Sequence, residues 1–219
     1  MNVFDMIGPV MIGPSSSHTA GAARIGYIAS RLLGEPAVRA DILLHGSFAK
    51  TYKGHGTDKA LIAGILGMQP DDARLRFSPE LAVQQGLAVT LTAGEIMDAH
   101  PNTARIALEG KSGKCISVQG ASIGGGNVRI TQVNGMAVEI TGQHITFIVL
   151  HRDAPGTIAA VTEMMAQQQV NICNFSLSRL EKGGTACMTI EVDGRIDPQL
   201  NEAIGKLPNI ISSTVLVPN

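Results

Sequence analysis

Residues 145–161, "ITFIVLHRDAPGTIAAV", decide the fold of the last third of this chain. Residues 145–150 form a short and continuously apolar run, which is typical of a buried strand. A Pro-Gly pair follows at residues 155–156, and apolar residues then recur at helical spacing over residues 158–165. The stretch therefore predicts a buried strand joined through a tight turn to a helix.

The sequence on the C-terminal side continues this alternation. Four further elements, in the order strand, strand, helix and strand, are predicted at residues 170–180, 186–192, 198–207 and 210–217. "EKGG" (181–184) is the turn between the two strands, and Asp197 is placed to cap the helix. The resulting order is βαββαβ, the split βαβ arrangement of ferredoxin-like domains.

Residues 145–219 resemble the ACT domains, which bind amino acids in regulated metabolic enzymes, most closely in "HRDAPGTIAAV" and "VNICNFSL". The resemblance implies that ACT domains pair and hold an amino-acid effector between them. The matching effector-binding positions here are His151, Asp153 and Asn171. In the alternative interpretation Asp153 only caps the helix, Asn171 only starts a strand, and the domain serves for packing.

The preceding residues predict a separate mixed α/β domain. Its strands are expected at residues 38–44, 88–92, 103–109, 114–120, 125–133 and 136–141. One helix is expected from Ser17 or Thr19 to Leu33, and two more within residues 46–67, where Thr57 or Asp58 caps the second. A boundary near Gly142 divides this α+β chain into domains 1–143 and 144–219.

Composition excludes several classes of protein. The 219 residues are 44% hydrophobic, carry a net charge of −1 and include 3% aromatic residues, so neither a basic surface nor stacking rings favour nucleic-acid binding. Cys115, Cys173 and Cys187 are widely spaced, which suits a reduced cytoplasmic protein and offers no self-contained metal site. No Lys or Arg precedes Arg24 and the longest apolar run, residues 60–68, is short, so neither a signal peptide nor a membrane helix is expected.

Four loops of small and polar residues around a potential catalytic group are the candidate functional segments. They are "GPSSSHTAGAARIG" (13–26), "KGHGTD" (53–58), "DAHPNT" (98–103) and "SIGGGNV" (122–128). Hydroxyls and free N–H groups at a helix N-terminus favour an anion site in the first loop, although a capped helix with a flexible entry explains it equally. His55 lies between two glycines and can act as a general base, or be structural. Phosphate-loop, GxGxxG and HExxH motifs are absent from the sequence.

Taken together and in order, these loops resemble the β subunit of iron–sulfur-dependent L-serine dehydratase. The resemblance implies conversion of L-serine to pyruvate and ammonia. It also implies a 4Fe-4S cluster that acts as a Lewis acid and is ligated by a separate α subunit. It also implies His55 as the catalytic base and His18 as the next candidate. The residues implied to line the substrate site are Ser15, Ser16, Ser17, Thr19, Thr57, Asp58, His100 and Asn102, with Thr57 and Asp58 orienting His55.

Two other functions fit part of this pattern. The first domain also resembles the allosteric substrate-binding domain of phosphoglycerate dehydrogenase, so the chain could be a non-catalytic amino-acid sensor. A pure assembly scaffold is the third possibility. The two loop histidines favour the dehydratase, because neither a sensor nor a scaffold requires them.

Overall fold

The computed structural model describes residue 11 and residues 13–218, which form two compact units. One unit ends at Asn134 and the other begins at Gly135, whereas the predicted domain boundary near Gly142 stays a prediction. Residues 1–10, to which the expectation of no signal peptide applies, lie outside the described residues.

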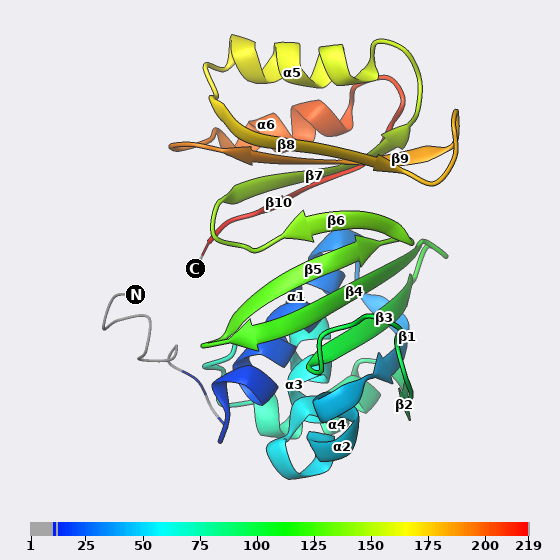
Figure 1. Ribbon diagram of the computed structural model, residues 1–219, viewed down its shortest axis with the longest axis vertical. Helices are drawn as coiled ribbons and strands as arrows, with labels where there is room; N and C mark the ends of the chain where they lie inside the picture. Colours follow the sequence, from blue (N-terminus) through cyan, green and yellow to red (C-terminus); the bar gives the residue numbers. More distant parts are fainter. Residues whose placement is uncertain (1–10, 12, 219) are drawn as a thin grey trace. The chain divides into compact units, whose positions relative to one another are not determined.

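The first unit is built on a mixed sheet (Figure 1). Its strands are β1 (Ala37–Leu44), β2 (Ala88–Ala93), β3 (Thr103–Gly110), β4 (Cys115–Gly124) and β5 (Asn127–Val133). They run in the order β2-β1-β3-β4-β5, with β1 and β2 parallel and the other neighbours antiparallel. All five were predicted, because each combines apolar alternation with a flanking turn.

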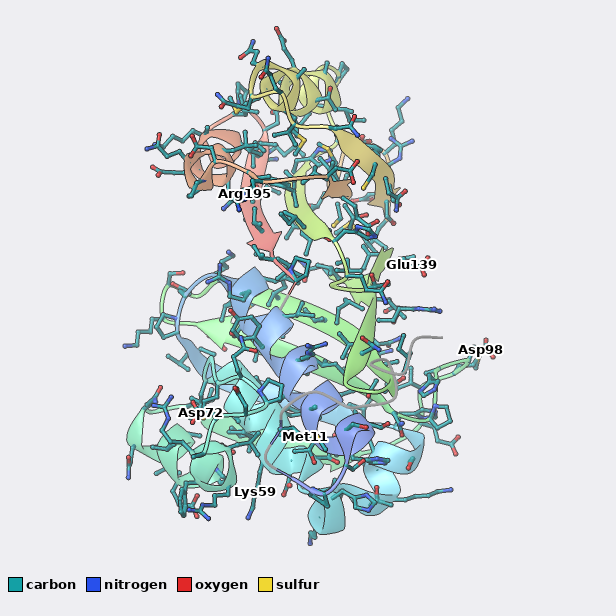
Figure 2. All side chains as sticks on the ribbon, turned by 90° about the vertical axis from the view of Figure 1, so that its left-hand side faces the viewer. Met11, Lys59, Asp72, Asp98, Glu139 and Arg195 are labelled. Atoms are coloured by element: carbon teal, nitrogen blue, oxygen red, sulfur yellow. The ribbon has the colours of Figure 1, made fainter. Side chains whose placement is uncertain are left out.

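Helices cover one face of this sheet. They are α1 (Gly21–Leu33), α2 (Gly46–His55), α3 (Thr57–Ile65) and α4 (Ser78–Gln84), with a π-helical turn η2 (Ser16–Ala20) and a 3-10 turn η3 (Leu75–Phe77). Figure 2 shows α1, in blue, lying across the green strands. Nine of its residues are buried, and they form the apolar stripe that the sequence predicted. The short helix α4 was not predicted.

Glycines let α1 and α3 approach closely. A Cβ on Gly64 would lie 2.0 Å from the Ala23 carbonyl oxygen, and one on Gly26 would lie 2.3 Å from that of Leu61. Only residues without a Cβ fit at these two positions, so the helix pair has a fixed separation. This contact sets how the N-terminus of α1 stands relative to that of α3.

Two helix starts differ from the prediction. Ser15, and not Ser17 or Thr19, is the N-cap of η2, the turn that leads into α1. The N-cap of α3 is Gly56, and no side chain caps it, so neither Thr57 nor Asp58 does so. Ser15 is the N-cap because its backbone is extended, whereas residues 16–20 already have helical backbone. An N-cap requires non-helical backbone.

The second unit confirms the ferredoxin-like order of the ACT segment. After β6 (Met136–Ile140) come β7 (Ile145–Arg152), α5 (Thr157–Gln167), β8 (Ile172–Arg179), β9 (Thr185–Val192), α6 (Pro198–Gly205) and β10 (Ile210–Leu216). The sheet order is β10-β7-β9-β8, with every neighbouring pair antiparallel. Asp197 caps α6 as predicted. The core lies between the sheet and the two helices and includes Phe147, Val161, Met188 and Ile204.

Candidate active site

His18 lies in η2, and serine hydroxyls contact both of its ring nitrogens. Ser15 accepts a hydrogen bond from the His18 backbone N–H at 3.1 Å, and its Oγ lies 3.3 Å from Nδ1. Nε2 lies 2.9 Å from the Oγ of Ser47, at the start of α2. These contacts tie the "SSSHT" loop to the end of β1, from which α2 begins.

The His18 ring contacts two other rings. Its centroid is 4.7 Å from that of His55, at the end of α2, and 5.5 Å from that of the buried Phe48. Burial, and secondarily the charge of His55, lower the pKa of His18 below its usual 6.5. The structure therefore brings together the two predicted catalytic histidines and favours the neutral form of His18.

Contacts of the backbone fix the position of His55. α2 ends on Gly56 in the left-handed conformation, and the Thr19 hydroxyl donates to the His55 carbonyl oxygen at 3.2 Å. The Nδ1 atom of His55 and the hydroxyl of Thr57 are both buried, and neither has a partner among the described residues. The hydrogen bond expected from Thr57 to the ring is therefore not formed.

Asp58 makes no hydrogen bond to the His55 ring among the described residues either. Its Oδ1 accepts from the Lys59 backbone N–H at 2.8 Å, and it lines a separate hollow with Tyr52 and Ile62. Its carboxylate stands in the first turn of α3, where a negative charge stabilises the helix dipole. The predicted orienting role of Asp58 is supported by no contact among the described residues and stays a prediction.

The "HPN" loop closes onto the start of α2. The Pro101 carbonyl accepts from the Ser47 backbone N–H at 2.7 Å, and a Cβ on Gly46 would lie 2.5 Å from the same oxygen. His100 is exposed, and its Nδ1 accepts from the Asn102 backbone N–H at 3.1 Å. This loop therefore positions α2, and nothing in it places His100 against His18 or His55.

The "SIGGG" loop is a tight hairpin. Gly124 pairs with Asn127, so Gly125 and Gly126 form a two-residue turn, and their φ angles of 59° and 78° suit glycine. The turn carbonyl of Gly126 accepts from Arg24 at 3.1 Å. Glycine is therefore needed here for the hairpin.

Ser122 lies in β4 and packs directly against the start of α1. It is fully buried, and a Cβ on Gly21 would lie 2.1 Å from its Oγ. That Oγ has no partner among the described residues. Its backbone N–H donates to the Asn102 carbonyl at 3.0 Å, so β4 and the "HPN" loop together support the "SSSHT" loop.

The three predicted effector residues do not form one cluster within the chain. His151 lies near the end of β7 beside Ala186 of β9, which pairs in turn with Arg179 at the end of β8. Asn171 precedes the start of β8, so roughly 25 Å of strand separates it from Arg179 at about 3.3 Å per residue. The predicted effector set is therefore divided between the two ends of the sheet.

Each of these effector positions also has an internal role. Asp153 accepts from the Gly183 N–H at 2.9 Å and pairs with Arg179, and these contacts, the first above all, lower its pKa. It holds the turn between β8 and β9, and Gly156 is the N-cap of α5, so the helix-cap interpretation of Asp153 is wrong. Asn171 donates to Asp193 at 2.9 Å. His151 is buried, with Nε2 unpaired among the described residues.

Two site residues were missed by the sequence analysis. Ser47 and Phe48 contact the His18 ring but stand outside the four loops. The signal was the "HGSF" tetrapeptide directly after a buried strand, where a serine at a helix start is available for a ligand or a neighbouring loop.

Two properties of the described residues bear on cofactors and membranes. No group of three or more His, Cys, Asp and Glu side chains in this part of the chain could hold a metal ion. No helix within it has the length and apolar character to cross a membrane.

Comparisons with known proteins agree with both halves of the structure. A family model described as "Serine dehydratase beta chain" matches residues 2–85, and an "AHAS small subunit-like ACT domain" model matches residues 147–212. The chain is 44% identical to the "Probable L-serine dehydratase, beta chain" of Bacillus subtilis, over 97% of this chain and 96% of that one.

Two longer proteins contain a related segment. An "L-serine dehydratase" of Mycobacterium bovis is 30% identical over 89% of this chain, which corresponds to 44% of its own length. A "D-3-phosphoglycerate dehydrogenase" of Bacillus subtilis is 25% identical over 87% of this chain and 36% of its own. The second match agrees with the predicted fold of both units.

Proposed function

We propose, from the premise that this chain belongs to the serine dehydratase beta chain family, that it provides the proton-abstracting part of an L-serine dehydratase active site. The observation that carries the proposal is the His18–His55 pair, with ring centroids 4.7 Å apart, at the meeting point of the "SSSHT" and "GHGT" loops. The His18 ring is held by two serine hydroxyls and favours its neutral form. The His55 ring has a buried nitrogen with no partner among the described residues.

The reaction assigned to this pair is a β-elimination from L-serine. The imidazole of His55 takes the Cα proton, and the electron pair of that C–H bond forms the Cα–Cβ double bond as the hydroxyl group leaves. The resulting enamine hydrolyses to pyruvate and ammonia. Hydroxyl and N–H groups of Ser15, Ser16, Ser17 and Thr19 would bind the serine carboxylate at the turn that starts α1.

A 4Fe-4S cluster does not fit the residues of this chain. Cys115 begins β4, Cys173 lies in β8 and Cys187 in β9, and burial raises the pKa of Cys187 to about 12. A cluster needs several thiolates directed at one point, so these three cysteines are not its ligands. We assign the cluster, and with it the departure of the hydroxyl group, to an α subunit.

The Mycobacterium bovis protein supports a partner of this kind. The match spans 44% of that single chain, which leaves more than half of it to supply what a separate α subunit would supply here. Cytoplasmic assembly is consistent with three free cysteines.

Pairing of ACT units would create the effector site. β8 is an edge strand on which Phe175 and Leu177 are 37% and 39% exposed. If two copies of β8 pair antiparallel, Asn171 of one chain lies opposite the Arg179 end of the other, beside Asp153 and His151. L-serine would then bind between two chains.

Leu177→Lys should yield monomers by light scattering and abolish the heat of serine binding, whereas dimers with unchanged binding would contradict this arrangement.

Anaerobic co-purification tests the main proposal. The chain is produced with and without an α subunit, and iron content and pyruvate formation from L-serine are measured. Pyruvate is expected only from the complex. A chain that binds L-serine by calorimetry but yields no pyruvate with any cluster-bearing partner would instead be an amino-acid sensor.

A further inference from the structure

His45 joins the start of α2 to a loop that lies 51 residues further along the chain. It follows β1 directly and is the N-cap of α2, with an extended backbone. Its backbone N–H donates to the Thr103 carbonyl oxygen at 3.0 Å, and its ring Nδ1 accepts from the Ile96 N–H at 3.1 Å. Ile96 belongs to the loop of residues 94–102, which joins β2 to β3 and contains the "HPN" motif.

The ring of His45 acts as a hydrogen-bond acceptor. A backbone N–H can only donate, so Nδ1 of His45 accepts from Ile96 and carries no proton. Ile96 is buried, whereas its neighbour Met97 is 90% exposed. The ring therefore holds the 94–102 loop at the residue that anchors it to the unit.

The N-terminus of α2 depends on the same loop. The first turn of a helix leaves backbone N–H groups without partners inside the helix, and an N-cap side chain commonly accepts from one of them. The side chain of His45 makes no such bond to α2. Instead, the Pro101 carbonyl oxygen accepts from the N–H groups of Ser47 and Phe48, at 2.7 and 3.4 Å. The N-cap residue thus holds the loop, and the loop caps the helix in return.

Ser47 connects this arrangement to the candidate active site. Its Oγ lies 2.9 Å from Nε2 of His18, and the His18 ring contacts that of His55. The backbone N–H of the same serine is bonded to Pro101, so the place of its hydroxyl depends on how closely the 94–102 loop lies against α2. A loop released at Ile96 would loosen its hold on Ser47 and thereby the contact with His18.

We propose that His45 is a positioning residue: its ring holds the 94–102 loop on α2 and so keeps Ser47 beside His18. The proposal rests on the proposed dehydratase function, because the place of His18 matters for the reaction only when the neighbouring His55 takes a proton. The effect passes from the His45 ring to the loop through Ile96, and from the loop to Ser47 through the Pro101 carbonyl.

The experiment compares a variant that keeps the acceptor with one that lacks it. His45→Asn retains an acceptor oxygen close to the place of Nδ1, whereas His45→Leu is of similar size and has none. In the full chain, His45→Leu should speed amide hydrogen exchange at Ile96 by about tenfold or more and change the imidazole nitrogen-15 NMR signals of His18. In the assembled enzyme its turnover should fall by about tenfold or more. His45→Asn should restore the His18 signals and bring both rates to within about threefold of the parent.

Thr51→Val is the matched control, because it removes a hydrogen bond of 2.8 Å within α2, from Thr51 to the Ser47 carbonyl oxygen, and leaves the contacts of the loop in place. Its Ile96 exchange and its turnover should stay within about twofold of the parent. Parent-like exchange or parent-like turnover in folded His45→Leu would overturn the proposal. Equal loss in the Leu and Asn variants would overturn it as well, because the acceptor would then not be what matters.

Two further comparisons cover the remaining outcomes. If His45→Leu does not fold, His45→Gln, whose acceptor lies one bond further from the backbone, must show faster Ile96 exchange and lower turnover than His45→Asn, and equal values would overturn the proposal. Hydrogen exchange and NMR of the full chain do not depend on turnover. A parent complex that forms no pyruvate, together with the expected exchange and His18 signals in the variants, would refute the dehydratase function and retain the structural role of His45.

Discussion

His18 and His55 have the same side chain but different surroundings. Two serine hydroxyls engage both nitrogens of His18, whereas Nδ1 of His55 is buried with no partner among the described residues. A buried nitrogen without a partner is costly, and sites that bind ligands tolerate that cost. This difference is the residue-scale reason to assign proton abstraction to His55 and a supporting role to His18.

Replacement of His55 tests that assignment. His55→Asn in the assembled enzyme should lower turnover at least 100-fold, since loss of a general base typically costs about 10²- to 10⁴-fold. Iron content and melting temperature must match those of the parent. The exposed His144 offers a control, and His144→Asn should stay within twofold. A fall of less than fivefold for His55→Asn would transfer the role of base to His18.

The lowered pKa of His18 also predicts a pH dependence of stability. Its folded pKa lies below the 6.5 of the unfolded chain, so between the two values the unfolded state binds more protons. The free energy of unfolding should therefore fall as the pH drops from 7 to 5.5, a window in which carboxylates stay ionised. Urea titrations at the two pH values should show this fall in the parent and a smaller one in His18→Asn. An equal fall in the free energy of unfolding for the two proteins would contradict the prediction.

At the scale of elements, helix packing holds the site together. α1 carries the "SSSHT" loop at its start, α3 follows directly after His55, and the two helices meet at Gly26 and Gly64. The distance between the loops thus depends on two positions that accept no Cβ. The same logic applies at Gly46, where the "HPN" loop approaches α2.

Gly64→Ala should destabilise the protein by about 1–3 kcal/mol, the usual effect of overpacking, because its Cβ would meet the Ala23 carbonyl. Gly54→Ala is the control: it lies in α2, and no atom outside its own helix lies within 4 Å of the place that the added methyl group would take. A gain of up to about 1 kcal/mol is expected there, since alanine is the better helix former. Denaturant unfolding measures both, and equal stability of the two variants would argue against a tight helix contact.

At the scale of the whole molecule, the proposed catalytic residues and the proposed effector residues lie in different units. The paired histidines lie in the unit that ends at Asn134, and the predicted effector residues lie in the unit that begins at Gly135. The cysteines are divided as well: one is in β4 and two are in the ACT sheet. We therefore expect the proposed cluster to be held by another subunit.

The isolated chain should accordingly bind no stoichiometric iron after anaerobic reconstitution, and its visible spectrum should lack a cluster band. The complex with an α subunit should contain iron. A reconstituted chain with a stable band would show that its cysteines converge in some other arrangement. Cys187→Ser should not change the result, because a thiol whose pKa is raised to about 12 is a poor ligand.

The sequence alone determined the elements, because their signals are local: the alternation of β1, the turn at Asn134-Gly135, and the Asp197 cap of α6 each depend on a few neighbouring residues. It also identified His55 as the candidate base and His18 as the next candidate. Only the tertiary structure decided that Ser47 contacts His18, that Asp58 accepts from the Lys59 backbone and that Asn171 lies far from Asp153 within one chain. Those facts follow from how α1 packs on α3 and from strand order and register, which depend on contacts between residues distant in sequence and cannot be read from local pattern.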